Sequence, residues 1–245
     1  MDRDDAPVGR VLSRREALTV LGASGLVLVV GGRHERYAWA ASKARLPACV
    51  ARPEQTEGPY FVDQMLNRSD IRADPKSGVV KEGTPLALTL AVSALRAGSC
   101  APLPGAHVDI WHCDAAGVYS GVEDPGFDTR GQSFLRGYQI TDKAGEARFR
   151  TIYPGWYSGR TVHIHFKIRT DPTAERGHEF TSQLYFDDAL TTRVLGRMPY
   201  AAKTGRRDLN ADDRIFTRGG DQLLLTPKSA GDGYTARFEV GLQLA

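Results

Sequence analysis

A series of short apolar or alternating runs, each ended by turn-forming residues, extends from Pro85 to the end of the chain. Several are rich in Val, Ile, Phe, Tyr and Thr, a composition typical of strands. Segments between them, such as "AGSCAPLPG" and "YPGWYSG", are rich in Gly, Pro and Ser. Many short strands joined by turns are typical of β-sandwiches and barrels. The predicted strands cover residues 85–95, 105–113, 135–142, 146–154, 161–170, 180–188, 222–227 and 234–244.

We therefore predict an all-β fold, a β-sandwich of mixed or antiparallel strands with long loops. Residues 41–84 are less regular and are expected to wrap around the sandwich as the N-terminal part of the same domain, whose core is residues 85–245. Only "TTRVLGR", residues 191–197, has a helix-like pattern. A length of 245 residues with 41% hydrophobic and 25% charged residues suits one soluble domain preceded by a leader.

The charge of the chain argues against a nucleic-acid-binding role. The formal net charge at pH 7 is +3, and much of the basic excess lies near the N-terminus. No block of basic residues interleaved with aromatic ones occurs in the sequence, although that pattern is expected of a nucleic-acid surface. We therefore expect no nucleic-acid partner.

The first 40 residues have the features of an export signal. An Arg14-Arg15 pair precedes the apolar run "ALTVLGASGLVLVVGG", and "AWA" at residues 38–40 offers a small-x-small cleavage site. The pair resembles a bacterial Tat signal, although Ala17 stands where a Phe or Leu is more common. We predict a periplasmic or extracellular protein that begins near Ala41 and is not inserted in the membrane after cleavage. The alternative is an uncleaved anchor, for which the glycine-broken run is marginal in length.

The chain has three cysteines, Cys49, Cys100 and Cys113. In an oxidising compartment they allow one disulfide and one free thiol, and the sequence does not choose among the pairings. No pair has zinc-finger spacing, which argues against a structural zinc knuckle.

Two histidines stand one residue apart in the apolar run "TVHIHFKI". Because strand side chains alternate between faces, His163 and His165 share one face and Ile164 and Phe166 share the other. The histidine face is either a polar surface or one side of a metal site. Tyr157 lies just upstream, in the loop that leads into this strand.

Tyr119, at the end of "VDIWHCDAAGVYS", adds a second phenol close to a predicted strand. A phenolate is a hard anionic oxygen donor that must lose a proton of high pKa, which a trivalent cation compensates. Two phenolates cancel two of the three charges of Fe(III), and two neutral imidazoles complete four ligands. The sequence therefore favours oxidised iron that binds a chelating phenolic substrate.

The motif set resembles the intradiol ring-cleavage dioxygenases, the family of protocatechuate 3,4-dioxygenase and catechol 1,2-dioxygenase. The resemblance rests on "PEQTEGPYF", "RSDIR", "GTPLALTLAV", "PLPGAHVDIWHCDAAGVYS", "TIYPGWYSGRTVHIHF", "TSQLYF" and "GYTARFEVGL". The leader and the "CAPLPG" and "WHCDA" variants make the chain most similar to an exported, single-chain subgroup.

The resemblance implies a role for individual residues. The iron ligands fall on Tyr119, Tyr157, His163 and His165. Tyr157 would also be displaced by substrate and take up a proton, Arg160 would stabilise charge on the substrate ring, and Gln183 matches the pocket glutamine. Further candidates for the substrate pocket are Trp111, which could equally be a packing residue, and Tyr60.

The implied activity is that of a non-haem Fe(III) dioxygenase. It would insert both atoms of O2 into a catechol-type diol and cleave the ring between the hydroxylated carbons to a cis,cis-muconate-type product. The partners would be the aromatic diol and O2, and the chain could form a homo-oligomer. The alternatives are an exported zinc or copper protein that uses His163, His165 and His112, or a catalytically degenerate aromatic-binding protein. The sequence does not identify the diol.

Overall fold

The computed structural model describes residues 50–96, 99–171 and 177–244. The predicted export signal and Cys49 lie outside these residues, as does the middle of the loop before Gln183. Within the part described, Cys100 is disulfide-bonded and Cys113 is a buried free thiol. None of the helices described is long and apolar enough to cross a membrane.

The larger of two main sheets is built around the long strand β1 (Pro85–Arg96). Strand β11 (Gly233–Gln243) pairs with one edge of β1 in parallel. The other edge pairs antiparallel with β7 (Glu146–Ile152) and then with β2 (Ser99–Pro102). Strand β10 (Lys228–Ala230) extends the sheet beyond β11.

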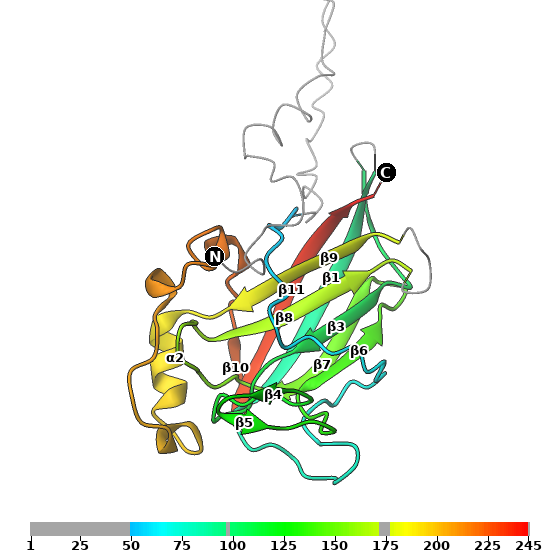
Figure 1. The fold of residues 1–245 in the computed structure, drawn as a ribbon. Helices are drawn as coiled ribbons and strands as arrows, with labels where there is room; N and C mark the ends of the chain where they lie inside the picture. Colours follow the sequence, from blue (N-terminus) through cyan, green and yellow to red (C-terminus); the bar gives the residue numbers. More distant parts are fainter. Residues whose placement is uncertain (1–49, 97–98, 172–176, 245) are drawn as a thin grey trace, which may run out of the picture.

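The second sheet has four antiparallel strands in the order β6, β3, β8, β9. Their bounds are Arg136–Ile140, His107–Trp111, His163–Arg169 and Glu179–Tyr185 respectively. The two sheets pack face to face, with the four-stranded sheet in front of β1 and β11 (Figure 1). The predicted β-sandwich with mixed strand directions is confirmed.

The core between the sheets is formed by the apolar face of each strand. In β8, Ile164, Phe166 and Ile168 are fully buried in it. Because successive side chains point to opposite faces, His163 and His165 must lie on the outer face of the same sheet. Other core residues are Leu86, Leu88, Leu90, Val108, Ile110, Phe149, Phe180, Leu184, Phe238 and Val240.

Residues 50–84 add no strand to either sheet. They touch the sheets through isolated bridges, such as Ala51 with Gly241 and Asn67 with Tyr138. In Figure 1 the first part of this segment crosses the outer face of the four-stranded sheet. This position makes it the cover of the face that carries the two histidines.

The predicted helix is confirmed as α2 (Asp188–Leu195), which begins earlier than the pattern suggested. Asp187 caps it by accepting a hydrogen bond from Leu190 N. Three short 3₁₀ helices follow, η2 (Tyr200–Ala202), η3 (Asn210–Asp212) and η4 (Gly220–Leu223).

The predicted strand at residues 222–227 is wrong. Its first residues belong to η4, and Leu224 makes only an isolated bridge with Tyr185. Leu223 and Leu225 are buried in the core without a strand ladder. A short apolar run indicates that its side chains are buried, but buried side chains do not have to belong to a β-strand.

Four short strands were missed. Strands β2 and β10 lie in segments that were interpreted as turns, and the hairpin of β4 (Glu123–Asp124) and β5 (Phe127–Asp128) has no predicted counterpart. Two-residue strands are too short to show a hydrophobic period. The hairpin matters because it lies beside the site described next.

Candidate metal centre

The outer face of β8 carries His163 and His165, which are 2% and 1% exposed. The strand register places Trp111 on one side of His165 and Gln183 on the other. The Trp111 ring stacks on the His165 ring at 5.0 Å with 7° between the planes. The first part of residues 50–84, which covers this face, approaches His165 closely at Gly58. A Cβ at Gly58, where φ is +72°, would lie 3.3 Å from Cε1 of His165. Only glycine allows this approach without strain.

Tyr119 reaches the histidines from the loop after β3. A turn at Asp114 reverses the chain, because its Oδ1 accepts hydrogen bonds from Ala116 N and Val118 N, both at 3.0 Å. Tyr119 is 1% exposed and packs with Trp111 and Cys113. Tyr157 comes from the loop before β8, and its side chain is only partly buried.

The four side chains that were predicted as ligands converge on one point. The Nε2 atom of His163 lies 3.0 Å from Nε2 of His165, 3.2 Å from the hydroxyl of Tyr157 and 3.4 Å from the hydroxyl of Tyr119. Oxygen and nitrogen ligands bound to one ion at about 2.0–2.2 Å lie roughly 3 Å from each other. The donor spacing therefore fits side chains that share one metal ion.

The protonation of His163 leaves its inner nitrogen available as a ligand. Its Nδ1 lies 2.6 Å from the carbonyl of Thr161, so we assign the ring proton to Nδ1 and a lone pair to Nε2. Burial, assisted by the charge of Arg160, holds the pKa of His163 and of His165 well below the usual value. Both imidazoles are thus neutral, as metal ligands must be.

The two phenols need a cation in order to ionise. Burial raises the pKa of Tyr157 to about 12, although the charge of Arg160 opposes this, and burial also raises the pKa of Tyr119 well above its usual value. A strongly Lewis-acidic ion compensates the cost of a buried phenolate. Two phenols with two neutral imidazoles therefore fit Fe(III) better than a softer divalent ion.

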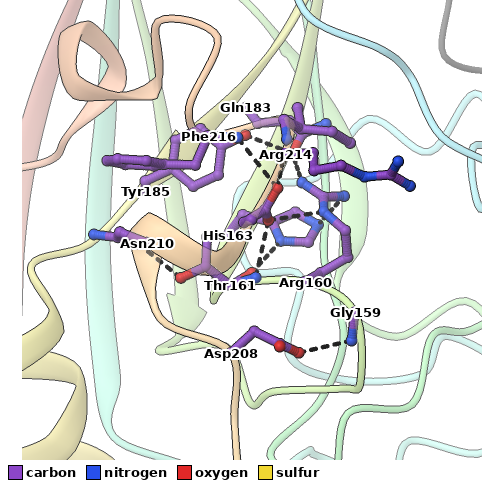
Figure 2. Close-up of polar contacts among 12 residues, drawn as sticks. Gly159, Arg160, Thr161, His163, Gln183, Tyr185, Asp208, Asn210, Arg214 and Phe216 are labelled. Carbon is purple, nitrogen blue, oxygen red and sulfur yellow. Dashed lines mark hydrogen bonds and ion pairs between the residues drawn. The ribbon is translucent and has the colours of Figure 1, made fainter.

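Arg160 borders the donor cluster and is anchored on several sides. Its NH1 lies 3.5 Å from Nε2 of His163, its NH2 donates to Oε1 of Gln183, and its Nε donates to Oδ2 of Asp213 at 2.9 Å. Figure 2 shows Arg160, Gln183 and Tyr185 gathered around His163. Burial alone would lower the pKa of Arg160, but Tyr157 and Asp213 outweigh it and raise that pKa. The guanidinium is therefore a permanent cation beside the cluster.

Gln183 is held by its own partners. Its Nε2 donates to the carbonyl of Thr56 at 2.9 Å, and its Oε1 accepts from the Tyr185 hydroxyl at 3.0 Å. The residue is fully buried. The amide of Gln183 thus links Thr56, in the segment that covers this face, to Arg160.

Sequence reasoning missed Asp213 and Tyr185. Asp213 is 53 positions from Arg160 and stands in the acidic run "NADDRIF", which has the composition of a solvated loop. Tyr185 ends the same strand as Gln183, two residues on, so it shares that face. Strand alternation could therefore have identified Tyr185, whereas no local signal identifies Asp213.

Tyr60 closes the opposite side of the cluster. Its ring stacks on Tyr119 at 4.4 Å and meets Tyr157 edge-on at 6.3 Å. Its hydroxyl donates to Oδ2 of Asp124, in the β4–β5 hairpin, at 2.8 Å. The structure therefore brings the predicted pocket residues Tyr60 and Trp111 to the donor cluster.

His112 does not join the site. Its Nε2 lies 2.6 Å from Oγ1 of Thr151 and its Nδ1 lies 2.8 Å from the carbonyl of Cys113. Across the described ranges, no three His, Cys, Asp or Glu side chains form a metal-binding group. A zinc or copper site built on three histidines is thus not assembled, and any metal site here depends on the tyrosines.

A family model described as "Dioxygenase" matches residues 56–205, more than half of the chain. Among curated relatives, chlorocatechol 1,2-dioxygenase of Pseudomonas putida is 27% identical over 196 residues, which cover 72% of this chain and 65% of that enzyme. The chain thus spans less than two thirds of that relative's length.

Solved structures give a consistent likeness. The intradiol ring-cleavage dioxygenase from Tetranychus urticae is 28% identical, with a TM-score of 0.68 over 80% of this chain and 95% of that one. The dioxygenase domain of a carbohydrate-binding fusion protein from Streptomyces sp. SirexAA-E is 30% identical, with a TM-score of 0.57 over 80% of this chain and 100% of that one.

Proposed function

Because this chain belongs to the intradiol ring-cleavage dioxygenase family, we propose that it is a non-haem Fe(III)-dependent enzyme that acts on a catechol-type diol. It inserts both atoms of O2 and cleaves the ring between the hydroxylated carbons, giving a cis,cis-muconate-type product. The observation that carries the proposal is the convergence of two phenol oxygens and a second imidazole nitrogen within 3.4 Å of Nε2 of His163.

Tyr119, Tyr157, His163 and His165 would hold the iron. When bound, Fe(III) would supply Lewis acidity that binds the diol and activates its ring toward O2. Tyr157 is the more exposed of the two phenols, so its hydroxyl oxygen is the one placed to leave the cluster and take a proton from the incoming diol.

Arg160 supplies fixed positive charge where the substrate ring gains electron density. Preorganised charge in a buried site stabilises such a transition state without reorganisation. Gln183 accepts a hydrogen bond from Arg160 and holds its orientation. Tyr60 and Trp111 cover the other side and exclude water, which keeps the local dielectric low and strengthens the effect of Arg160.

The substrate is proposed to be a catechol without an anionic substituent. The curated relatives that match are named catechol and chlorocatechol 1,2-dioxygenases. The carboxylate of Asp124 contacts Tyr60 at the border of the site, so a carboxylated diol would bring a second negative charge close to it. This supports catechol or a chlorocatechol over protocatechuate.

Oxygen uptake with labelled O2 tests the proposed function. Iron-loaded protein is offered catechol, 4-chlorocatechol, protocatechuate and hydroxyquinol under ¹⁸O2 without a reductant, with the His163→Ala variant as the inactive control. We expect uptake with catechol or 4-chlorocatechol and two labelled oxygen atoms in an acyclic dicarboxylate. Iron-loaded protein that consumes no O2 with any of the four diols would overturn the proposal.

We also propose that the chain is exported and cleaved near Ala41. The proposal rests on Arg14, Arg15 and the following apolar run. N-terminal sequencing of the secreted product, beside a variant with both arginines changed to Lys, tests it. A product beginning at Met1 would refute export with cleavage.

We further propose that the chain assembles as a homo-oligomer, because each chain carries a complete donor set. Light scattering of the purified protein tests the assembly, and a monomer would refute it.

A further inference from the structure

Asp213 is a buried carboxylate in the segment that follows η3. It is 1% exposed and accepts four hydrogen bonds. Its Oδ2 accepts from Nε of Arg160 and from Thr161 N, both at 2.9 Å. Its Oδ1 accepts from Ile215 N at 2.7 Å and Phe216 N at 3.1 Å. Such saturation fixes the carboxylate in place.

The ion pair with Asp213 decides which edge of Arg160 faces the donor cluster. The guanidinium is planar, so two fixed nitrogens set the orientation of the third. Asp213 holds Nε and Gln183 holds NH2, which leaves NH1 directed at Nε2 of His163, 3.5 Å away. Without Asp213 only the contact with Gln183 would remain to orient the group.

Asp213 is also the charge partner of Arg160. Among the described residues it is the only carboxylate that forms an ion pair with this guanidinium, whose side chain is 15% exposed. A buried cation without a partner is costly and tends to turn toward water. The carboxylate thus keeps the cation at the site.

The same segment holds the backbone that leads into β8. Oδ2 of Asp208 accepts from Gly159 N, and Oδ1 of Asn210 accepts from Oγ1 of Thr161, each at 2.7 Å. The Thr161 carbonyl in turn contacts Nδ1 of His163. Figure 2 shows Asn210 reaching Thr161 from the left and Asp208 reaching Gly159 lower in the view. The segment from residue 208 to 213 therefore clamps the loop that carries Arg160.

We propose that Asp213 is the positioning residue of Arg160: it aims the guanidinium at the ring of a bound diol and acts through Arg160 alone. The proposal rests on the proposed function but adds a residue that lies beyond the matched family region, which ends at residue 205. The competing interpretation is a structural role, in which Asp213 only stabilises the turn at Ile215 and Phe216.

A double-mutant cycle separates the two roles. The variants are Asp213→Asn, Arg160→Met and the double variant, all loaded with Fe(III). The matched control is Asp212→Asn, because Asp212 is adjacent but exposed. Two quantities are measured: kcat and KM by O2 uptake, and the Kd of 4-nitrocatechol by absorbance titration under argon.

If Asp213 acts through Arg160, Asp213→Asn lowers kcat about 30-fold and Arg160→Met about 100-fold. The double variant then matches Arg160→Met within about two-fold. The Kd of 4-nitrocatechol follows the same non-additive pattern with smaller changes. The resting spectrum and iron content stay as in the wild type, and Asp212→Asn is unchanged.

Multiplicative losses in the double variant, or wild-type kcat and Kd in Asp213→Asn, would overturn the proposal. Iron loss in Asp213→Asn would assign Asp213 a structural role instead. If Asp213→Asn does not fold, Asp213→Glu retains the charge one methylene further out. We expect it to fold with kcat lowered about five-fold, and full activity would contradict the proposal. A wild-type protein that is inactive toward diols would instead sink the proposed function.

Discussion

Two walls of opposite character enclose the donor cluster. The polar wall consists of Arg160, Gln183, Tyr185 and Asp213. The aromatic wall consists of Tyr60, Trp111 and Phe127. In the polar wall every member is joined to another by a hydrogen bond or ion pair. In the aromatic wall the contacts are ring stacks: Tyr60 lies 4.4 Å from Tyr119 and Trp111 lies 5.0 Å from His165.

The difference assigns separate tasks to the two walls. The polar wall holds a fixed cation at the cluster, so it can stabilise negative charge on a substrate. The aromatic wall holds no charge of its own and shapes a dry boundary. The charge of Arg160 acts on Tyr157, whereas Tyr60 stacks on Tyr119 and meets Tyr157 only edge-on, so the aromatic wall covers Tyr119 more closely than Tyr157. The following predictions test this division, from the largest expected effect to the smallest.

His163→Ala should abolish the site, because His163 is the point on which the other three donors converge. We expect loss of iron and a fall in kcat of roughly 10³-fold or more. Metal analysis and O2 uptake check this. His178→Ala, a histidine at the far end of the sheet before β9, is the control and should keep its iron. Stoichiometric iron in His163→Ala would show that His163 is not needed to hold the metal.

Tyr157→Phe should retain iron but lower kcat by about 10²-fold, because the variant has no phenol oxygen to accept a proton from the diol. Stopped-flow absorbance under argon should show diol binding without the matching proton transfer. Turnover at the wild-type rate would show that Tyr157 does not accept a proton from the diol during the reaction.

Tyr119→Phe should act on the metal more than on proton transfer. Tyr119 is buried under Tyr60, so we expect iron affinity to fall about ten-fold or more. One component of the visible charge-transfer band should disappear. A spectrum identical to that of the wild type would exclude Tyr119 as a ligand.

Asp124→Asn should give the smallest change. The Gly126 amide and the Tyr60 hydroxyl lower the pKa of Asp124, so it is charged at neutral pH, and the Asn side chain keeps an acceptor for Tyr60. Solvent screens the charge, so we expect only about a two-fold rise in the kcat/KM ratio of protocatechuate to catechol. Asp128→Asn, on the same hairpin, is the control. An unchanged ratio would show that the charge of Asp124 does not influence the choice of substrate.

The strand pattern carried most of what could be predicted. Alternation in "TVHIHFKI" placed His163 and His165 on one face and the apolar residues in the core, and the structure confirms both. The motif resemblance brought Tyr119 and Tyr157 to the same cluster. Local patterns sufficed here because the strand repeat is short and strictly two residues.

Contacts between distant segments could not be predicted. Asp212 and Asp213 are identical neighbours in sequence, yet one is exposed and the other is 1% exposed against Arg160. The β4–β5 hairpin, which places Asp124 on Tyr60, is too short to leave a periodic signal. Such positions depend on tertiary packing, which no local pattern records.

The visible absorption spectrum of the purified protein, taken together with its metal content, tests the account most directly. Two phenolates bound to ferric iron predict about one iron per chain and a broad tyrosinate-to-iron band that makes the sample red-brown. A colourless protein that contains no iron and remains unchanged after addition of ferric salt would contradict the account.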